Sequence, residues 1–249
     1  MHRLTSWKRH CEKLLICSDY MDFMFDISGL TSNDEEFSTS KKDVLKFLKI
    51  IGVDTRFISY TPEKIYINNL RFSKFSRTRE ATFNKQYSEI EVVRNKLFQK
   101  ICSKSSKVLS DEIKPNSRIL MPEDNFIIEL IMEPYTRKYG VELIYEGEYD
   151  LKVNPLVLDD EVNNIFEGIF SGEGLNITKR DDEIFPLINV SFDWINSFLE
   201  MDGQDILEKQ NKNELANSFS EFLDDVAPQY RENVLKASEY IEAKLEAEK

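Results

Sequence analysis

MDFMFDISGLTSNDEEFSTSKKDVLKFLKIIGVDTRFISY, residues 21–60, is the stretch that decides the fold. Loose alternation of apolar and polar residues, rich in aromatic side chains, predicts a strand over Met21–Ile27. Ser40 is a suitable N-cap for a helix with one apolar stripe, and Gly52 stands where a left-handed C-terminal cap is expected. A second strand is predicted over Val53–Tyr60. The stretch therefore predicts a strand–helix–strand unit.

A second strand–helix–strand pattern lies near the middle of the chain. Arg118–Met121 is a short apolar run that predicts a buried strand, and the apolar face of Phe126–Ile131 predicts a helix that Pro134 ends. Another strand is predicted over Val141–Tyr145. Two units of this kind are typical of an α/β fold with a mostly parallel sheet and flanking helices.

The segment between the two units has weaker patterns. Residues 65–72 predict a further strand or the edge of a hairpin. Residues 71–87 show little periodicity, which is typical of a solvated loop, although their mixture of aromatic and basic side chains also suits base stacking with phosphate contact. A capping-box pattern of serine and glutamate predicts a helix over residues 88–101, followed by an irregular linker over residues 103–117.

The last part of the chain predicts helices. Residues 147–182 are acidic and irregular in pattern. From residue 185 onward, apolar stripes at helical spacing predict a helical section, whose last two helices form an antiparallel hairpin separated by Pro228. We therefore predict an α/β nucleotide-binding-like domain over residues 1–184 and a C-terminal helical section over residues 185–249.

Length and composition limit the possible classes of protein. A chain of 249 residues can bury a core without disulfides. Its three cysteines, Cys11, Cys17 and Cys102, lack any CxxC spacing, which predicts buried thiols and no metal site. No run approaches the roughly 20 apolar residues of a membrane span, so neither export nor membrane insertion is predicted. The expected location is the cytoplasm.

Charge is distributed unevenly along the chain. The formal net charge of −12 opposes binding of nucleic acid by the surface as a whole. Residues 71–107 nevertheless hold ten basic and three acidic side chains, a local net charge of +7. Such asymmetry predicts a surface that faces a polyanion, and the candidate RNA contacts are Arg71, Lys74, Arg77 and Arg79.

The turn after the first predicted strand is a candidate phosphate site. A strand, a glycine-containing turn and a helix N-terminus together present backbone N–H groups and a positive dipole end to an anion. Gly29 supplies the turn, and the hydroxyls of Ser28, Thr31 and Ser32 add donors. A plain strand-to-helix connection with a turn glycine explains the same residues.

Three parts of the chain resemble the PP-loop ATP pyrophosphatases. SGLTS at residues 28–32 resembles the SGGxDS signature of this family, and RILMP followed by PEDN resembles its second strand and acidic nucleotide-side turn. The PL-containing turn before the last helices is similar to the end of the tRNA 2-thiolation branch. The resemblance implies ATP or AMP with Mg²⁺ as ligands, with Asp124 on the nucleotide side.

The chain departs from the family pattern at the positions that carry catalysis. Leu30 replaces the second signature glycine, Thr31 stands where an aspartate precedes the final serine, and the paired cysteines of the thiolation branch have no counterparts. The resemblance therefore implies an inactive partner subunit in tRNA modification, with no catalytic residue assigned. A tRNA or another RNA is then the expected partner of residues 71–107.

Two other classes of function are open alternatives. A non-enzymatic interaction module would bind a protein partner through its acidic C-terminal helices. A Mg²⁺-dependent nuclease of the PD-(D/E)xK type would use Glu123 or Asp124 with Asp150 as metal ligands, and Lys152 to assist the attacking water. Histidine-based catalysis is not expected, since both histidines lie near the N-terminus and no GxSxG motif occurs.

Overall fold

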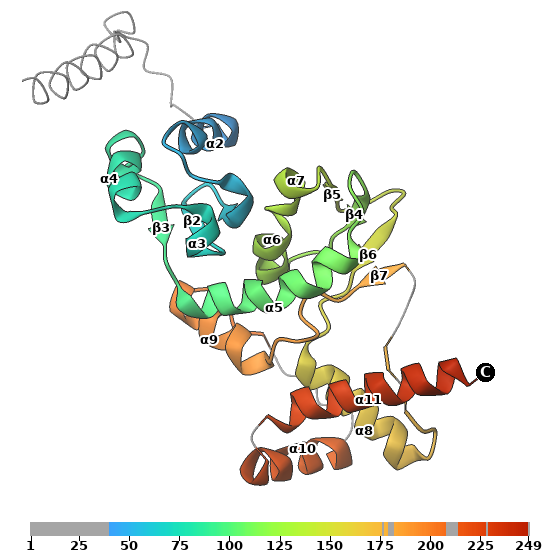
Figure 1. Ribbon diagram of the computed structural model, residues 1–249. Coiled ribbons are helices and arrows are strands. Elements are labelled where there is room, and N and C mark those ends of the chain that lie inside the picture. The colour runs from blue at the N-terminus through green and yellow to red at the C-terminus, as the bar shows by residue number, and fades with distance from the viewer. Residues whose placement is uncertain (1–39, 176, 179–181, 208–213, 228, 249) are drawn as a thin grey trace, which may run out of the picture. The chain divides into compact units, whose positions relative to one another are not determined.

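The computed structural model describes most of the chain after residue 39 (Figure 1), and these residues belong to one compact unit. The predicted strand Met21–Ile27 and the glycine turn after it lie outside the described residues, so that part of the first strand–helix–strand unit stays a prediction. Within the described residues, no helix is both long and apolar enough to cross a membrane. The described ranges are 40–175, 177–178, 182–207, 214–227 and 229–248.

A three-stranded mixed sheet forms the first part of the described fold. Its strands β1 (Ile58–Tyr60), β2 (Lys64–Ile67) and β3 (Glu91–Val93) lie in the order β1-β2-β3. β1 and β2 pair antiparallel as a hairpin, whereas β2 and β3 pair parallel. The short 3₁₀ helix η1 (Thr55–Phe57) leads into β1, so this strand is shorter than the one predicted over Val53–Tyr60.

Helix α2 (Lys41–Ile50) confirms the helix predicted from its caps. The Ser40 hydroxyl accepts a hydrogen bond from the Lys42 N–H at 3.3 Å, and Gly52 has a φ of 83°. The helix packs its buried Val44 and Leu48 in one core with the buried residues of β1 and β2.

The segment between β2 and β3 is helical, which corrects the predicted loop over residues 71–87. It contains α3 (Leu70–Ser73) and α4 (Arg77–Gln86). Asn69 caps α3, and Ser76 caps α4 by accepting from the Arg79 N–H at 3.3 Å. The two fully buried rings of this segment, Phe75 and Phe83, fix it on the core. The strand predicted over residues 65–72 accordingly ends at Ile67.

The helix predicted over residues 88–101 starts later than its serine–glutamate pattern indicates. Glu91–Val93 forms β3 because it pairs in parallel with β2. Helix α5 (Lys96–Glu112) begins after Asn95, whose side-chain oxygen accepts from the N–H groups of Leu97 and Phe98 at 2.8 and 3.1 Å. The irregular linker predicted over residues 103–117 is also wrong, since α5 continues to Glu112.

A parallel sheet forms the second part of the fold and confirms the predicted α/β class. Its four strands lie in the order β5-β4-β6-β7, and each neighbouring pair is parallel. The connection from β4 to β5 runs through α6 and α7, with Pro134 between the two helices, as the second sequence unit predicts. The strands are β4 (Arg118–Leu120), β5 (Glu142–Ile144), β6 (Leu151–Val153) and β7 (Glu183–Ile184). The helices are α6 (Phe126–Met132) and α7 (Tyr135–Lys138).

Helix α5 packs between the parallel sheet and α9 (Phe192–Asp202). The rings of Phe98 and Phe198 stack with centroids 4.9 Å apart. At the end of α9, Asp202 accepts a hydrogen bond from the Tyr66 hydroxyl at 2.8 Å and pairs with Lys64 at 3.1 Å. These contacts join α9 to the mixed sheet as well.

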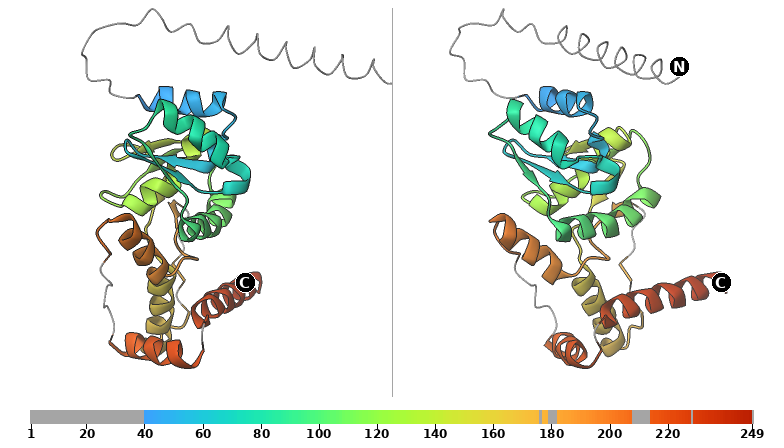
Figure 2. Two further views of the ribbon diagram at one scale, coloured as in Figure 1. Left: turned by 90° about the vertical axis from the view of Figure 1, so that its left-hand side faces the viewer. Right: turned by 60° about the vertical axis from the view of Figure 1, so that its left-hand side comes forward.

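The C-terminal section confirms that the predicted segments are helical, and it includes a helix from the segment predicted to be irregular. The predicted antiparallel hairpin of the last two helices is wrong, because each of them packs mainly on that additional helix and not on the other. Helix α8 (Leu158–Ser171) packs against both α10 (Glu214–Val226) and α11 (Tyr230–Ala247), which lie beside it in Figure 2. Their shared core includes Val162, Ile165 and Leu235. The domain boundary predicted at residue 184 stays a prediction.

Candidate nucleic-acid interface

The predicted nucleotide site lies mostly outside the described residues. Ser28, Gly29, Thr31 and Ser32 all fall there. Asp124 is described: it is exposed, with a φ of 50°, in the loop between β4 and the N-cap residue of α6. The phosphate loop predicted at residues 28–32 therefore stays a prediction.

Three of the four predicted RNA contacts come together around one hollow of about 670 Å³, here called the basic hollow. Lys74, Arg77 and Arg79 line it, joined by Arg94 and Lys96. Lys74 follows α3 in a left-handed conformation, with φ 55°, which turns the chain toward the first turn of α4. The fourth predicted contact, Arg71, is exposed on α3 and lies outside the lining, with its guanidinium 5.8 Å from the Phe72 ring centroid.

An internal ion cluster supports the basic hollow. The Glu80 carboxylate accepts hydrogen bonds from Arg94 at 2.7 Å and from Arg77 at 3.0 Å. Arg94 also donates to the Phe75 carbonyl at 2.7 Å, and it is largely buried. We infer that Arg94 serves mainly to join β3 to α4, because its charge is compensated by Glu80.

A second hollow, of about 440 Å³, adjoins the first through Lys74. Its lining adds Lys49, Arg56 and Arg137. Arg56 binds Asp54 with two hydrogen bonds at 3.0 and 2.8 Å, and these hold the pKa of the Asp54 carboxyl below its ordinary value. Lys49 and Lys74 are exposed and make no ion pair with any described residue. Their ammonium groups therefore keep their positive charge facing solvent.

A third hollow, of about 290 Å³, adjoins the second through Arg56 and is here called the aromatic pocket. The rings of Phe57 and Phe72 lie in its wall with centroids 5.3 Å apart, and Phe72 is 51% exposed. Tyr135 and Lys138 of α7 line the pocket as well, and the Lys138 ammonium lies 4.9 Å from the Tyr135 ring centroid. The pocket thus combines aromatic faces with positive charge.

Polar groups complete the aromatic pocket. Asn68 and Asn69 lie in its wall, and their side-chain NH₂ groups have no partner among the described residues. A row of serines on α5 forms another part of the lining, whereas the neighbouring Cys102 is a free, buried cysteine. Burial raises the pKa of the Cys102 thiol, so we expect it to be unreactive, as predicted for a buried thiol. Cys11 and Cys17 lie outside the described residues.

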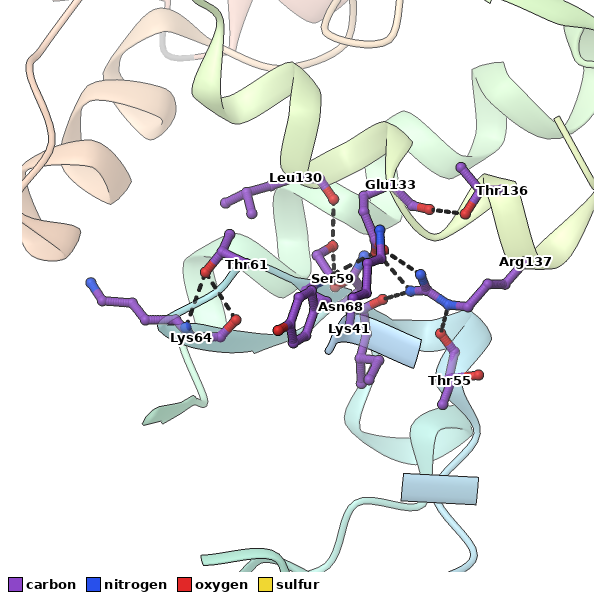
Figure 3. A network of polar contacts seen from close by, with 12 residues as sticks. Lys41, Thr55, Ser59, Thr61, Lys64, Asn68, Leu130, Glu133, Thr136 and Arg137 are labelled. Carbon is purple, nitrogen blue, oxygen red and sulfur yellow. Dashed lines mark hydrogen bonds and ion pairs between the residues drawn. The ribbon is translucent and has the colours of Figure 1, made fainter. Parts of the chain in front are cut away.

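A polar network holds the walls of the aromatic pocket together (Figure 3). Arg137 of α7 donates to the backbone carbonyls of Thr55 and Ile58 at 2.9 and 2.7 Å, and it pairs with Glu133. Glu133 also binds the Lys41 ammonium at 2.8 Å. The network thereby fixes η1, which carries Arg56 and Phe57, against the helix that carries Tyr135 and Lys138.

Two residues of the nuclease alternative, Asp150 and Lys152, have partners in the structure, whereas Glu123 and Asp124 are exposed. The Asp150 carboxylate accepts from the Arg118 N–H at 2.7 Å, and Lys152 lies 3.8 Å from a Glu183 oxygen. Among the described residues, no three histidine, cysteine or acidic side chains gather in a group able to hold a metal ion.

The three adjoining hollows form what we call the basic face, which the sequence predicts only in part. Its cations come from the end of α2, from η1, from the α3–α4 turn, from the start of α5 and from α7. The basic segment over residues 71–107 predicts Lys74, Arg77, Arg79 and Lys96 as a charged run. No sequence pattern connects Arg56 or Lys138 to that run, since only the folded chain brings them to the same surface.

The chain was compared with known protein families and structures. No family model and no curated protein matches it. Among solved structures, it is similar to the U34-tRNA thiolase NcsA from Methanococcus maripaludis with its 4Fe–4S cluster, with 13% sequence identity and a TM-score of 0.45, over 64% of this chain and 83% of that chain. This likeness is too distant to assign a family.

Proposed function

We propose that this protein binds RNA through the basic face, as a non-catalytic subunit in tRNA modification. The observation that carries the RNA part is the succession of three adjoining hollows, lined by cations and ending in an aromatic pocket, on a chain of net charge −12. An acidic chain repels polyanions in general, so a positive surface of this extent indicates a specific anionic ligand.

Each hollow suits a different part of a nucleotide chain. Lysine and arginine side chains bind phosphate oxygens and supply most of the affinity for nucleic acid. Aromatic rings stack on unpaired bases, and amide groups hydrogen-bond to base edges. In the proposed complex, the basic hollow and the second hollow bind consecutive phosphates, while a base of an unpaired segment stacks at Phe72.

The link to tRNA modification is the finer part of the proposal. It rests on the sequence resemblance to PP-loop proteins, and the parallel strands around α6 and α7 are compatible with it. The same resemblance proposes ATP or AMP with Mg²⁺ as a ligand on the side of Asp124.

A thermal-shift measurement tests the nucleotide part separately from the RNA part. A nucleotide at 100 times its dissociation constant is expected to stabilise the protein by roughly 2.7 kcal/mol. The unchanged protein is heated with ATP or AMP, each with and without Mg²⁺. An unchanged melting temperature under all four conditions would remove the nucleotide from the proposal and leave the RNA proposal standing.

Titration with tRNA tests the RNA part. The variant Lys74→Gln, Arg77→Gln, Arg79→Gln removes three charges from the basic hollow, and we expect its affinity for tRNA to fall by on the order of tenfold or more. Arg71→Gln alone is expected to have a smaller effect than Lys74→Gln alone, because Arg71 lies outside the hollow. Fluorescence anisotropy at fixed salt measures both comparisons.

A matched variant controls for the loss of charge itself. Lys42→Gln, Lys46→Gln, Lys236→Gln removes three exposed lysines that line none of the three hollows. Phe72→Ala removes an exposed ring without changing charge, and it is expected to weaken binding of single-stranded RNA by about 1–3 kcal/mol. Equal losses of tRNA affinity in the two charge variants would contradict a specific basic face.

A further inference from the structure

Helix α10 carries an apolar stripe on its exposed side. Leu215, Phe219, Phe222 and Val226 follow one another at spacings of four, three and four residues, which places them on one face of a helix. Their exposed fractions are 61%, 36%, 58% and 59%. Sequence periodicity alone predicts that such a face packs in the protein's own core. In the structure only Phe219 packs partly against α8, and the other three side chains are mostly exposed.

The packing of α10 on α8 uses a different side of the helix. Ala216 and Ser220 are the buried residues of α10. The Ser220 hydroxyl donates to the Asn163 side-chain oxygen at 2.7 Å, and the Asn163 NH₂ group donates to the Asn217 side-chain oxygen at 3.1 Å. Ala216, Ser220 and the partly buried Leu223 attach α10 to α8, and the Phe219 ring meets Phe166 of α8 edge to face at 5.1 Å. Leu215, Phe222 and Val226 make no such contact and stay mostly exposed.

The apolar surface continues from α10 onto α8. Phe170 is 41% exposed, and its ring meets the Phe219 ring edge to face at 5.5 Å. Phe219 in turn lies 6.4 Å from Phe222. Solvent-exposed apolar residues that form a continuous patch, rather than lying singly, mark surfaces that bind other molecules. We call the residues Phe170, Leu215, Phe219, Phe222 and Val226 the α10 patch.

Acidic residues line one flank of the α10 patch. Glu214, Glu221 and Asp225 are exposed, and none of them forms an ion pair with a described residue. The helix itself contains neither lysine nor arginine. A second copy of the chain docking there in the same way would bring two acidic flanks together, which is unfavourable. A partner with basic residues beside its apolar contacts would instead be attracted.

We propose that the α10 patch is the docking site for an amphipathic helix of a partner protein, with lysine and arginine flanking its apolar stripe. Apolar residues at this spacing form a stripe along α10 against which the apolar stripe of a second helix can pack side by side. The lysine and arginine side chains of the partner helix pair with Glu221 and Asp225, while its apolar side chains cover Phe219 and Phe222. The inference is independent of RNA binding, because it involves no residue of the basic face.

Two designed peptides test this docking site on the full-length chain. Both are labelled amphipathic helices with the same leucine stripe; one is flanked by lysine and arginine, the other by glutamate. We expect the basic peptide to bind at least tenfold more tightly than the acidic peptide in fluorescence anisotropy. Equal affinity for the two peptides, or no binding of the basic one, would overturn the proposal.

Variants of α10 separate docking from general attraction to an acidic protein. Phe222→Ser with Val226→Ser keeps every charge and changes only exposed side chains, so the fold is expected to persist while affinity for the basic peptide falls at least tenfold. Ile50→Ser with Met201→Ser removes equally exposed apolar residues from other helices and should leave that affinity unchanged. Unchanged binding by the Phe222 and Val226 variant would refute the assigned site.

A charge reversal and a measurement of mass complete the test. Glu221→Lys with Asp225→Lys is expected to invert the preference, so that the acidic peptide becomes the tighter ligand. An unchanged preference would contradict the role assigned to the acidic flank. Sedimentation equilibrium is expected to show a monomer; a dimer abolished by Phe222→Ser with Val226→Ser would show that a second copy is the occupant, contrary to the proposal.

Discussion

The backbone of Gly52 constrains the basic face. Its φ of +83° is in the left-handed region, and a Cβ atom at this position would lie 2.9 Å from the Arg79 guanidinium. The glycine thus ends α2 and at the same time leaves room for a cation of the basic hollow. Arg79 is held there by its hydrogen bond to the Lys74 carbonyl.

Gly52→Ala is expected to affect both stability and RNA binding. The left-handed conformation disfavours alanine by about 1 kcal/mol. Arg79 must also move away from the new methyl group, so we expect affinity for tRNA to fall. Denaturant unfolding measures the first effect, and anisotropy at fixed salt measures the second.

Gly203→Ala is the matched control for Gly52→Ala. Gly203 has a φ of +75°, and a Cβ atom there would meet nothing within 4 Å. The control is therefore expected to lose similar stability from backbone strain while keeping its affinity for tRNA. A loss of affinity in both variants would mean that general destabilisation, and not the position of Arg79, is responsible.

Local chemistry explains which residues can be assigned from the sequence. The roles of Ser40 and Gly52 are predictable because helix caps depend only on neighbouring residues. Lys74 adopts a left-handed conformation although it is not a glycine, so the sequence does not predict this turn. The contact of Arg137 with the Thr55 carbonyl joins residues far apart in the chain, and no local pattern contains that information.

At the scale of elements, an ion pair joins α5 to α11. The Lys104 ammonium lies 2.6 Å from a Glu232 oxygen, and this hydrogen bond lowers the pKa of the Glu232 carboxyl below its ordinary value of 4.5. Both side chains are partly exposed, so solvent screening keeps the contribution of the pair to stability below about 1 kcal/mol.

The pair predicts a small pH dependence of stability. A carboxyl with a lowered folded-state pKa stabilises the protein above its unfolded pKa, and this contribution is lost as the pH falls through the folded value. Glu232→Gln is therefore expected to be less stable than the unchanged protein at pH 7, with the difference shrinking below pH 4.5. Urea unfolding at several pH values measures it. A difference that is constant across this range would contradict the assigned pairing.

Elements with strong local signals are the ones that the sequence predicts. The parallel strands around α6 and α7 follow from short apolar runs with proline and glycine between the elements. The serine–glutamate pattern at residues 88–91 fails because pairing with β2 makes Glu91–Val93 a strand. Helix α4 shows little periodicity because Phe83 is its only buried residue.

At the scale of the whole molecule, the two proposed binding surfaces have opposite charge and lie on different parts of the chain. The basic face lies on the α/β part of the chain, and the α10 patch with its acidic flank lies on the helical section. RNA and a basic partner helix therefore do not compete for the same residues. This separation suits a scaffold subunit that binds RNA and a second protein.

The basic face is predictable from the sequence only as an excess of charge. The count of basic residues over 71–107 locates Lys74, Arg77 and Arg79, but it includes Arg94, which Glu80 neutralises. It misses Arg56, which the fold brings into one pocket with Phe72 and Lys138. The apolar stripe of α10 shows the same limit, because periodicity defines a face without showing which surface it meets.

The salt dependence of tRNA affinity is the most direct test of the central claim that the basic face binds RNA phosphates. Each phosphate contact contributes roughly 0.7 to the slope of log affinity against log salt for a single strand. The Lys74→Gln, Arg77→Gln, Arg79→Gln variant is therefore expected to have a slope shallower by about 2 than that of the unchanged protein. Equal slopes would contradict the account, because they would mean that these three cations contact no phosphate.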